Sequence, residues 1–384
     1  MFIPRQLDLM EALARKSCFL FGPRQTGKSM LIRETLPPAT PIYNLLDHRL
    51  WLDLNANPAR MREELEAKDL RDAIVVVDEI EKLPALLDEV HLLIETRGLR
   101  FLLTGSSARK LRRSGVNLLG GRARSRHLHP FSWRELGKDF DLIKALNHGL
   151  IPSIYGSDDP AEDLRAYLGS YLKEEIMAEG FTRNVPAFAR FLEVAAACSG
   201  RMINKTEVAN DAKVPRTTVN EYFEILKDTL IGYELPAWKH SQKRKAIETA
   251  KFYLFDVGVA RAIQKLPPLV PRSPDFGDAL EHYLFHELMT WIDTRRPGLE
   301  LHYWRSTSQF EVDFILGDHT AIEVKATSSV SPRDLKGLKA LAEEGLMKHL
   351  ILVCQEPTPR KIGDILVLPW QVFLERLWGD AYAE

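Results

Sequence analysis

The chain has 384 residues, a length that indicates two or three domains. Of these residues 45% are hydrophobic and 27% charged, as is usual in folded proteins. Its net charge of −1 excludes a polycation, so contacts with nucleic acid have to come from local basic patches. No apolar run approaches the ~20 residues of a membrane span, and the N-terminus has no signal-peptide apolar region. Cys18, Cys198 and Cys354 are far apart and form no CxxC pair. We therefore expect a cytoplasmic protein with reduced cysteines and no membrane partner.

The first predicted element is a short buried strand over 17–21, which leads into a glycine-rich octet. The octet fits the phosphate-binding pattern G-x-x-x-x-G-K-[S/T] with Gly22, Pro23, Arg24, Gln25, Thr26, Gly27, Lys28 and Ser29. A helical pattern begins at Ser29, so strand, loop and helix N-terminus together predict a cradle of backbone N–H groups for an anion. We expect Lys28 to reach the β- and γ-phosphates of ATP and Ser29 to ligate Mg²⁺. The alternative is an ordinary glycine turn before a helix.

The next apolar run, over 73–77, predicts a central parallel strand that is buried on both faces. Asp78 and Glu79 follow it, at the end of the strand where α/β sheets bind ligands. Asp78 suits a ligand of Mg²⁺, bound directly or through water, and Glu79 suits the base that orients the attacking water. Alone, the two carboxylates would indicate an acidic turn in solvent. The phosphate-binding loop upstream favours the catalytic interpretation.

A third strand is predicted over 99–104, and Gly105, Ser106 and Ser107 follow it. A polar residue at this strand end can contact both the γ-phosphate and the catalytic water. Ser106 is the candidate, with Thr104 and Ser107 as neighbours. The alternative is a Gly-Ser turn whose hydroxyl groups only cap the backbone.

Segments 22–29, 75–79 and 102–108 resemble the Walker A, Walker B and sensor-1 elements of the AAA+ ATPases. Segments 118–122 and 128–135 make the chain similar to a bacterial and archaeal AAA-type family whose members carry a C-terminal nuclease-like domain of uncharacterised function. The resemblance covers essentially the whole chain. It implies ATP and Mg²⁺ as cofactors and self-association into a homo-oligomer such as a hexameric ring.

The same resemblance directs attention to Arg122 on a glycine-rich turn. A guanidinium there could project toward the γ-phosphate bound by a neighbouring subunit, as an arginine finger. The alternative is a solvated basic loop. The sequence leaves open which arginine acts, because the same stretch also contains Arg112, Arg113, Arg124 and Arg126.

After residue 133 the pattern becomes helical, with helices predicted over 163–172 and 188–197. A helix over 204–210, a tight turn over 211–215 and a helix over 216–227 then form a helix-turn-helix pattern. The exposed start of its second helix carries the candidates for contacts to DNA bases or phosphates, namely Arg216, Thr217, Thr218 and Asn220.

Two strand-like runs, 230–235 and 251–255, follow the helix-turn-helix pattern. The segment between them is a candidate wing of a winged helix, and its tip carries Lys243, Arg244 and Lys245. Cations at a wing tip gain from counterion release when they contact a phosphate backbone. The alternative is a protein–protein module or an extension of the ATPase lid.

The last third predicts a hairpin with a strand over 311–316, a turn over 317–319 and a return strand over 321–326. Antiparallel pairing can bring Asp313, Glu323 and Lys325 together, and a preceding helix carries Glu281. The set resembles the PD-(D/E)xK nuclease core, which implies metal binding by Glu281, Asp313 and Glu323 and a catalytic role for Lys325. Val312 stands where that pattern has proline. An inactive fold used for binding or assembly is the alternative.

These patterns predict an α/β protein with an N-terminal P-loop AAA+ domain (1–136), a helical middle with a winged helix at about 185–260 (137–266), and a restriction-endonuclease-like domain (267–384). The primary functional hypothesis is an oligomeric ATPase that acts on DNA, with a metal-dependent nuclease domain. The alternative is a nucleotide-dependent switch that binds a protein partner and uses an inactive nuclease-like scaffold.

Overall fold

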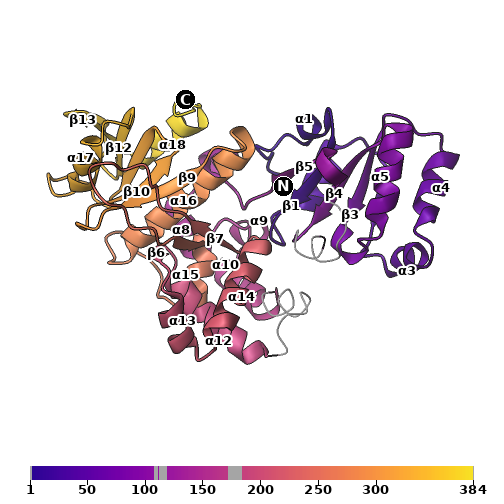
Figure 1. Cartoon of the computed structure of the whole chain (residues 1–384), viewed down its shortest axis with the longest axis horizontal. Helices are drawn as coiled ribbons and strands as arrows, with labels where there is room; N and C mark the ends of the chain where they lie inside the picture. The colour runs from indigo at the N-terminus through magenta and orange to yellow at the C-terminus, as the bar shows by residue number, and fades with distance from the viewer. Residues whose placement is uncertain (1, 108–110, 112–118, 172–183, 384) are drawn as a thin grey trace. The chain divides into compact units, whose positions relative to one another are not determined.

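The computed structural model describes residues 2–107, 111, 119–171 and 184–383. The chain forms two compact units (Figure 1). The first comprises Met1–Phe131 with Asp228–Ile231, and the second comprises Ser132–Lys227 with Gly232–Glu384. Among the described residues, no helix combines the length and the apolar character needed to cross a membrane.

The first unit is built on a parallel sheet with the strand order β2-β3-β4-β1-β5. Its strands are β1 (Ser17–Phe21), β2 (Ile42–Asn44), β3 (Ile74–Asp78), β4 (Arg100–Gly105) and β5 (Ala123–His127). Strand β4 pairs with both β1 and β3, so the carboxyl ends of these three strands lie at the same edge of the sheet. The N-terminal α/β sheet that the motifs predict is confirmed.

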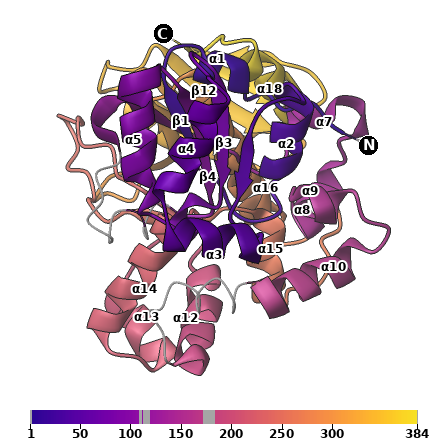
Figure 2. The ribbon, with the colours of Figure 1, turned by 90° about the vertical axis from the view of Figure 1, so that its right-hand side faces the viewer.

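Helices cover this sheet on both faces, which is why the strands β1, β3 and β4 are largely apolar runs (Figure 2). Along β1, Phe19 and Phe21 face one core cluster while Cys18 and Leu20 face the other. The first cluster contains residues of α3 (His48–Ala56), α4 (Ala59–Ala67) and α5 (Leu86–Arg97). The second contains residues of α1 (Leu9–Leu13) and α2 (Lys28–Thr35). Within the described part of this unit there are also the 3₁₀ turns η1 (Ile80–Lys82) and η2 (Leu119–Gly121).

The second unit begins with short helices: α7 (Trp133–Leu136), the 3₁₀ turn η3 (Gly137–Asp139), α8 (Leu142–His148), α9 (Pro152–Tyr155) and α10 (Pro160–Ala166). Helix α10 continues into the π-helical turn η4 (Tyr167–Tyr171). Asp159 caps α10, and Pro160 occupies its first turn. Proline fits there because its fixed φ and missing N–H cost nothing at a helix start.

The next part of this unit joins the four helices α12 to α15 to a small antiparallel sheet with the order β6-β8-β7. An aromatic series connects them, because the Phe223 ring lies 5.0 Å from that of Phe191 and 5.1 Å from that of Phe252. The elements are α12 (Val185–Ala197), β6 (Arg201–Met202), α13 (Lys205–Ala212), α14 (Arg216–Asp228), β7 (Gly232–Leu235), β8 (Lys251–Leu254) and α15 (Val257–Ile263).

The C-terminal part of the unit is a mixed sheet with the order β13-β14-β12-β11-β10-β9. The predicted hairpin is present, with Phe314 of β10 opposite Ile322 of β11. Its strands are β9 (Leu301–Arg305), β10 (Glu311–Leu316), β11 (Thr320–Val324), β12 (His349–Cys354), β13 (Arg360–Ile362) and β14 (Ile365–Pro369). The accompanying helices are α16 (Phe276–Arg295), α17 (Lys336–Ala342) and α18 (Trp370–Trp378).

Candidate nucleotide-binding site and carboxylate cluster

The first candidate site lies at the carboxyl edge of the parallel sheet. The glycine-rich octet follows β1, Asp78 ends β3, and Thr104 lies near the end of β4 between them. The Thr104 hydroxyl donates a hydrogen bond to Asp78 Oδ1 and accepts one from the Glu79 N–H at 3.2 Å. Three segments that are far apart in the sequence therefore meet where α/β sheets bind ligands.

The glycine-rich loop takes backbone conformations that explain its glycines. Gly27 caps the N-terminus of α2 with φ of 94°, in the left-handed region that glycine adopts at least cost. At Gly22 a Cβ atom would lie 2.4 Å from the Leu128 carbonyl oxygen, so a larger residue would displace the loop. The Thr26 hydroxyl bonds the Pro23 carbonyl at 2.8 Å across the turn. Contacts within the first unit thus define the shape of the loop.

Lys28 is held by the loop to which it belongs. Its ammonium donates hydrogen bonds to the carbonyl oxygens of Gly22 at 2.6 Å and Pro23 at 3.2 Å, and the residue is buried. A buried ammonium needs such acceptors to offset its lost hydration. The positive charge is therefore fixed at the turn where the sequence predicts the phosphates.

Arg5 is a residue that the sequence analysis missed. Its guanidinium donates to the Thr26 carbonyl at 2.6 Å and to the His129 carbonyl at 2.6 Å. It therefore fastens the glycine-rich loop to the segment after β5. No motif marks it, because these acceptors are backbone atoms that lie 21 and 124 residues away in the sequence.

The residues predicted to hold Mg²⁺ fit that role. Ser29 and Asp78 line one cavity of about 230 Å³ at the sheet edge, together with Asn44. Hydroxyl and carboxylate oxygens are the ligands that Mg²⁺ takes in proteins, with water and phosphate completing its shell. Asp78 is largely buried, and its Oδ1 is oriented by Thr104.

Glu79 and Glu81 occupy different environments on the turn after β3. Glu79 is half-buried with φ of 62°, and its side chain has no partner among the described residues. Glu81 is buried, and its Oε1 accepts hydrogen bonds from both the N–H and the hydroxyl of Ser106, at 2.8 and 3.0 Å. Burial, with the charge of Glu79, raises the pKa of Glu81 to about 7.

Ser106 is therefore oriented by Glu81, a residue that sequence reasoning passed over. Thr104, which was named as a neighbour of Ser106, is the hydroxyl that contacts Asp78. The spacing Asp78-x-x-Glu81 gives no strand or helix period, so no local pattern places Glu81 beneath β4. Whether Ser106 contacts the γ-phosphate stays a prediction.

Arg122 forms an ion pair with Glu95 of α5, and it is 39% exposed. The guanidinium lowers the pKa of Glu95 by hydrogen bonding and by its charge. Arg124 is exposed on β5, and Arg126 is half-buried there. Arg112 and Arg113 lie outside the described residues.

The predicted DNA contacts at the start of α14 lie at the surface. Arg216, Thr217 and Asn220 are exposed and Thr218 is half-buried, while Val219 is buried in the helical core. Arg216 lines a polar cavity of about 660 Å³ with Lys205 of α13. The predicted orientation of α14 therefore holds, and its function stays a prediction.

The predicted basic wing tip is partly paired within the unit. Arg244 Nη2 lies 2.7 Å from Glu343 Oε2, and the Lys243 N–H donates to Glu344 Oε2 at 2.8 Å. The Lys243 ammonium also bonds the Glu343 carbonyl. Lys245 is exposed, and its side chain has no partner among the described residues. Two of the three predicted wing-tip residues thus contact acidic residues at the end of α17.

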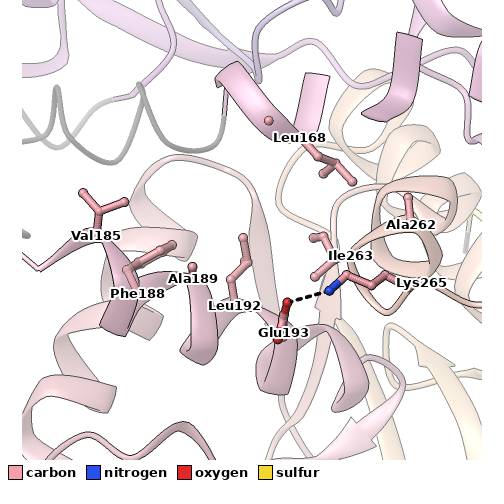
Figure 3. A pocket seen from close by; sticks show the side chains of 10 residues that line it. Leu168, Val185, Phe188, Ala189, Leu192, Glu193, Ala262, Ile263 and Lys265 are labelled. Carbon is pink, nitrogen blue, oxygen red and sulfur yellow. Dashed lines mark hydrogen bonds and ion pairs between the residues drawn. The ribbon is translucent and has the colours of Figure 1, made fainter. Parts of the chain in front are cut away.

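A separate apolar pocket of about 230 Å³ lies beside α12 (Figure 3). Phe188 and Leu192 line it from α12, and Ile263 lines it from the end of α15. An ion pair between Lys265 Nζ and Glu193 Oε1 at 3.3 Å closes one side. The pocket offers little hydrogen bonding and carries no chemical assignment.

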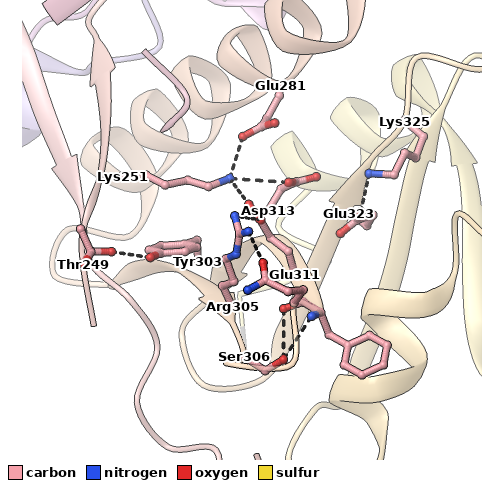
Figure 4. Close-up of polar contacts among 12 residues, drawn as sticks. Thr249, Lys251, Glu281, Tyr303, Arg305, Ser306, Glu311, Asp313, Glu323 and Lys325 are labelled. Carbon is pink, nitrogen blue, oxygen red and sulfur yellow. Dashed lines mark hydrogen bonds and ion pairs between the residues drawn. The ribbon is translucent and has the colours of Figure 1, made fainter. Parts of the chain in front are cut away.

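The candidate nuclease residues gather around β10 and β11 (Figure 4). Asp313 Oδ2 accepts the Val324 N–H at 2.8 Å, and Lys325 Nζ lies 2.5 Å from Glu323 Oε1. Burial and the charge of Asp313 raise the pKa values of Glu281 and Glu323. The antiparallel pairing thus brings together the side chains that the sequence selected.

The same cluster has features for and against a site for a divalent ion. One observation favours an ion, since Glu323 Oε2 is buried without a hydrogen-bond partner among the described residues. However, within the described ranges no three His, Cys, Asp or Glu side chains are arranged to hold a metal. The ammonium of Lys251 lies among Glu281, Glu311 and Asp313 instead. The residues present therefore do not fit a bound Mg²⁺.

Comparison with protein families assigns the first unit. Residues 14–137 match a family described as an AAA domain. Residues 139–269 and 276–373 match two families described as a domain of unknown function, DUF8612 and DUF4143. The candidate nucleotide site therefore lies within a segment that matches an AAA domain, which confirms the AAA+ part of the resemblance. The nuclease-like identity of the last third stays a prediction.

Among curated proteins, none matches the chain. Among solved structures, the Orc1 protein of Aeropyrum pernix in complex with DNA is 16% identical, with a TM-score of 0.27, over 68% of this chain and 91% of that one. A STAND-class signal transduction ATPase with a tetratricopeptide repeat sensor from Pyrococcus horikoshii is 12% identical, with a TM-score of 0.24. That match covers 77% of this chain and 48% of the other. Scores this low carry no argument about function.

Proposed function

We propose that the protein binds ATP with Mg²⁺ and hydrolyses it in the first unit. The observation that carries the proposal is the meeting of Lys28, Asp78 and Glu79 at one sheet edge within a matched AAA domain. Lys28 would hold the phosphates, and Glu79 would orient and deprotonate the attacking water. Mg²⁺ held by Ser29 and Asp78 would neutralise phosphate charge.

Two substitutions test the assignment of ATP binding and hydrolysis. Lys28→Ala removes a charge-assisted contact of about 1.5–3 kcal/mol, so fluorescent ATP should bind roughly 10- to 100-fold more weakly. Glu79→Gln should keep ATP binding and slow phosphate release by ~10²-fold or more. Glu63→Gln, an exposed change on α4, is the matched control and should behave as the parent. Parental turnover by Glu79→Gln would show that another group acts as the base.

We also propose that the second unit contacts DNA through the start of α14. Support comes from the order of helices and strands from α12 to β8, which is the one that a winged helix requires, and from the exposure of Arg216 and Thr217. Of the wing-tip residues, Lys245 is the one best placed to reach a phosphate, because Lys243 and Arg244 contact the end of α17. The tests at Glu79 and Lys28 do not depend on whether the second unit binds DNA.

Salt dependence tests the DNA proposal. Arg216→Ala should weaken binding of duplex DNA and make the slope of log affinity against log salt shallower by about 1 unit. Arg201→Ala is the control, since it removes an exposed arginine on β6 that pairs with Asp278. Equal effects of the two changes would indicate a general charge effect rather than a contact at α14.

A nucleotide-dependent switch that binds a protein partner is the second candidate function. The observation that favours it is the internal pairing of basic residues that DNA would otherwise contact, seen at Arg244 with Glu343. The two functions differ in one measurement. ATP hydrolysis that rises with DNA and falls steeply with salt supports the first, whereas hydrolysis indifferent to DNA supports the second.

A further inference from the structure

The ammonium of Lys251 lies beside two of the candidate nuclease residues, Glu281 and Asp313, and beside Glu311 (Figure 4). Lys251 begins β8, outside the segment in which the nuclease residues were predicted, and it is 3% exposed. Its Nζ lies 2.7 Å from Glu311 Oε1, 3.1 Å from Glu281 Oε1 and 3.7 Å from Asp313 Oδ1. Carboxylates from α16 and β10 thus converge on one cation that the chain itself supplies.

The three carboxylates around Lys251 also accept hydrogen bonds from other donors. The Tyr253 hydroxyl bonds Glu281 Oε1 at 2.6 Å, and Arg305 bonds Glu311 Oε2 at 3.0 Å. The Val324 N–H bonds Asp313 Oδ2 at 2.8 Å. A buried ion cluster is stable only when its charges are paired and its remaining hydrogen bonds are made. Here Lys251 pairs with all three carboxylates, and Tyr253, Arg305 and the Val324 N–H supply further hydrogen bonds from the protein itself.

Lys251 and a divalent ion would need the same oxygens. Mg²⁺ requires ligand oxygens at about 2.0–2.1 Å in octahedral geometry, and an ammonium among these carboxylates leaves no such position. Glu323 is likewise paired with an internal cation, through Lys325 at 2.5 Å. Both carboxylates of the predicted hairpin therefore face a lysine.

We propose that Lys251 takes the place of a divalent metal ion in this cluster. The C-terminal part of the second unit is then a metal-free scaffold, and its carboxylates fasten β8 to α16 and β10. The proposal explains how three acidic residues surround a buried position without forming a metal centre. It does not depend on ATP hydrolysis in the first unit.

Manganese binding to the nucleotide-free full chain tests the proposal, because the ATP-dependent ion is then not held. At about 1 mM Mn²⁺, electron paramagnetic resonance should detect the same amount of bound Mn²⁺ on the parent protein and on Asp313→Asn. Lys251→Gln removes the ammonium and should gain about one bound Mn²⁺. Lys251→Arg keeps a cation and should behave as the parent. Adding Asp313→Asn to Lys251→Gln should abolish the gained ion.

Two results would overturn the proposal. The first is Mn²⁺ bound to the parent and lost in Asp313→Asn, since Lys251 then coexists with a metal. The second is a folded Lys251→Gln protein, judged by circular dichroism, that binds no more Mn²⁺ than the parent. If Lys251→Gln does not fold, the comparison of the parent with Asp313→Asn still decides. ATP hydrolysis measured on the same samples reports separately on the first unit.

Discussion

Replacing Glu287 by glutamine should remove part of the pH dependence of stability of the second unit. Glu287 is completely buried on α16. Its carboxylate accepts hydrogen bonds from the Trp133 N–H at 2.7 Å, the Tyr283 hydroxyl at 3.0 Å and Trp378 Nε1 at 3.0 Å. It thereby connects the start of α7 to α16 and α18. Burial raises its pKa from 4.5 to about 7, although these hydrogen bonds oppose the shift.

The sign of the effect follows from proton binding. Between pH 4.5 and 7 the folded state keeps the Glu287 proton that the unfolded chain has lost, so the stability contribution of this group falls as pH rises. A shift of about 2.5 units corresponds to roughly 3 kcal/mol. Glutamine cannot ionise, so the variant lacks this pH-dependent contribution to stability. It also presents an amide N–H₂ to Trp378 Nε1, which should cost about 1–3 kcal/mol at every pH.

The expected result is therefore a stability difference that narrows with pH. Glu287→Gln should be less stable than the parent at pH 5, and the deficit should shrink by about 2–3 kcal/mol by pH 8. Urea unfolding followed by tryptophan fluorescence measures it, because six of the seven tryptophans lie in the second unit, Trp51 being the exception. A deficit that is constant from pH 5 to pH 8 would show that Glu287 is ionised in the folded state throughout.

Two further predictions concern the nucleotide site. Glu81→Ala should leave the buried N–H and hydroxyl of Ser106 without their acceptor, which should lower stability by about 1–3 kcal/mol and reduce ATP hydrolysis more than it weakens ATP binding. Glu81→Gln should keep both hydrogen bonds and most of the turnover. Equal turnover by the two variants would show that Ser106 needs no orientation. If the protein self-associates and Arg122 acts across subunits, the Arg122→Ala variant should bind ATP as the parent does. Mixing it with the Lys28→Ala variant should restore part of the ATP hydrolysis, because the two defects lie on opposite sides of an interface. A parental ATPase rate per subunit that is independent of protein concentration would count against that arrangement.

The sequence alone determined the features that depend on neighbouring residues. The order of residues in the glycine-rich octet required the loop after β1, and the apolar runs required strands buried on both faces. The turn at 317–319 and the period of two placed Asp313 and Glu323 on adjacent strands. Each of these is a short-range pattern, so propensity and spacing suffice to predict it.

Tertiary structure alone decided which distant groups meet at each site. Arg5 reaches the carbonyl groups of Thr26 and His129, and Glu81 reaches Ser106 beneath β4. Lys251 enters the carboxylate cluster from a strand about 60 residues before the hairpin. Such contacts follow from strand order and helix packing, which no residue spacing encodes. The tertiary structure decides which cation lies next to a buried carboxylate and pairs with its charge. For this reason the sequence can contain the pattern of a metal site while the folded protein places a lysine there.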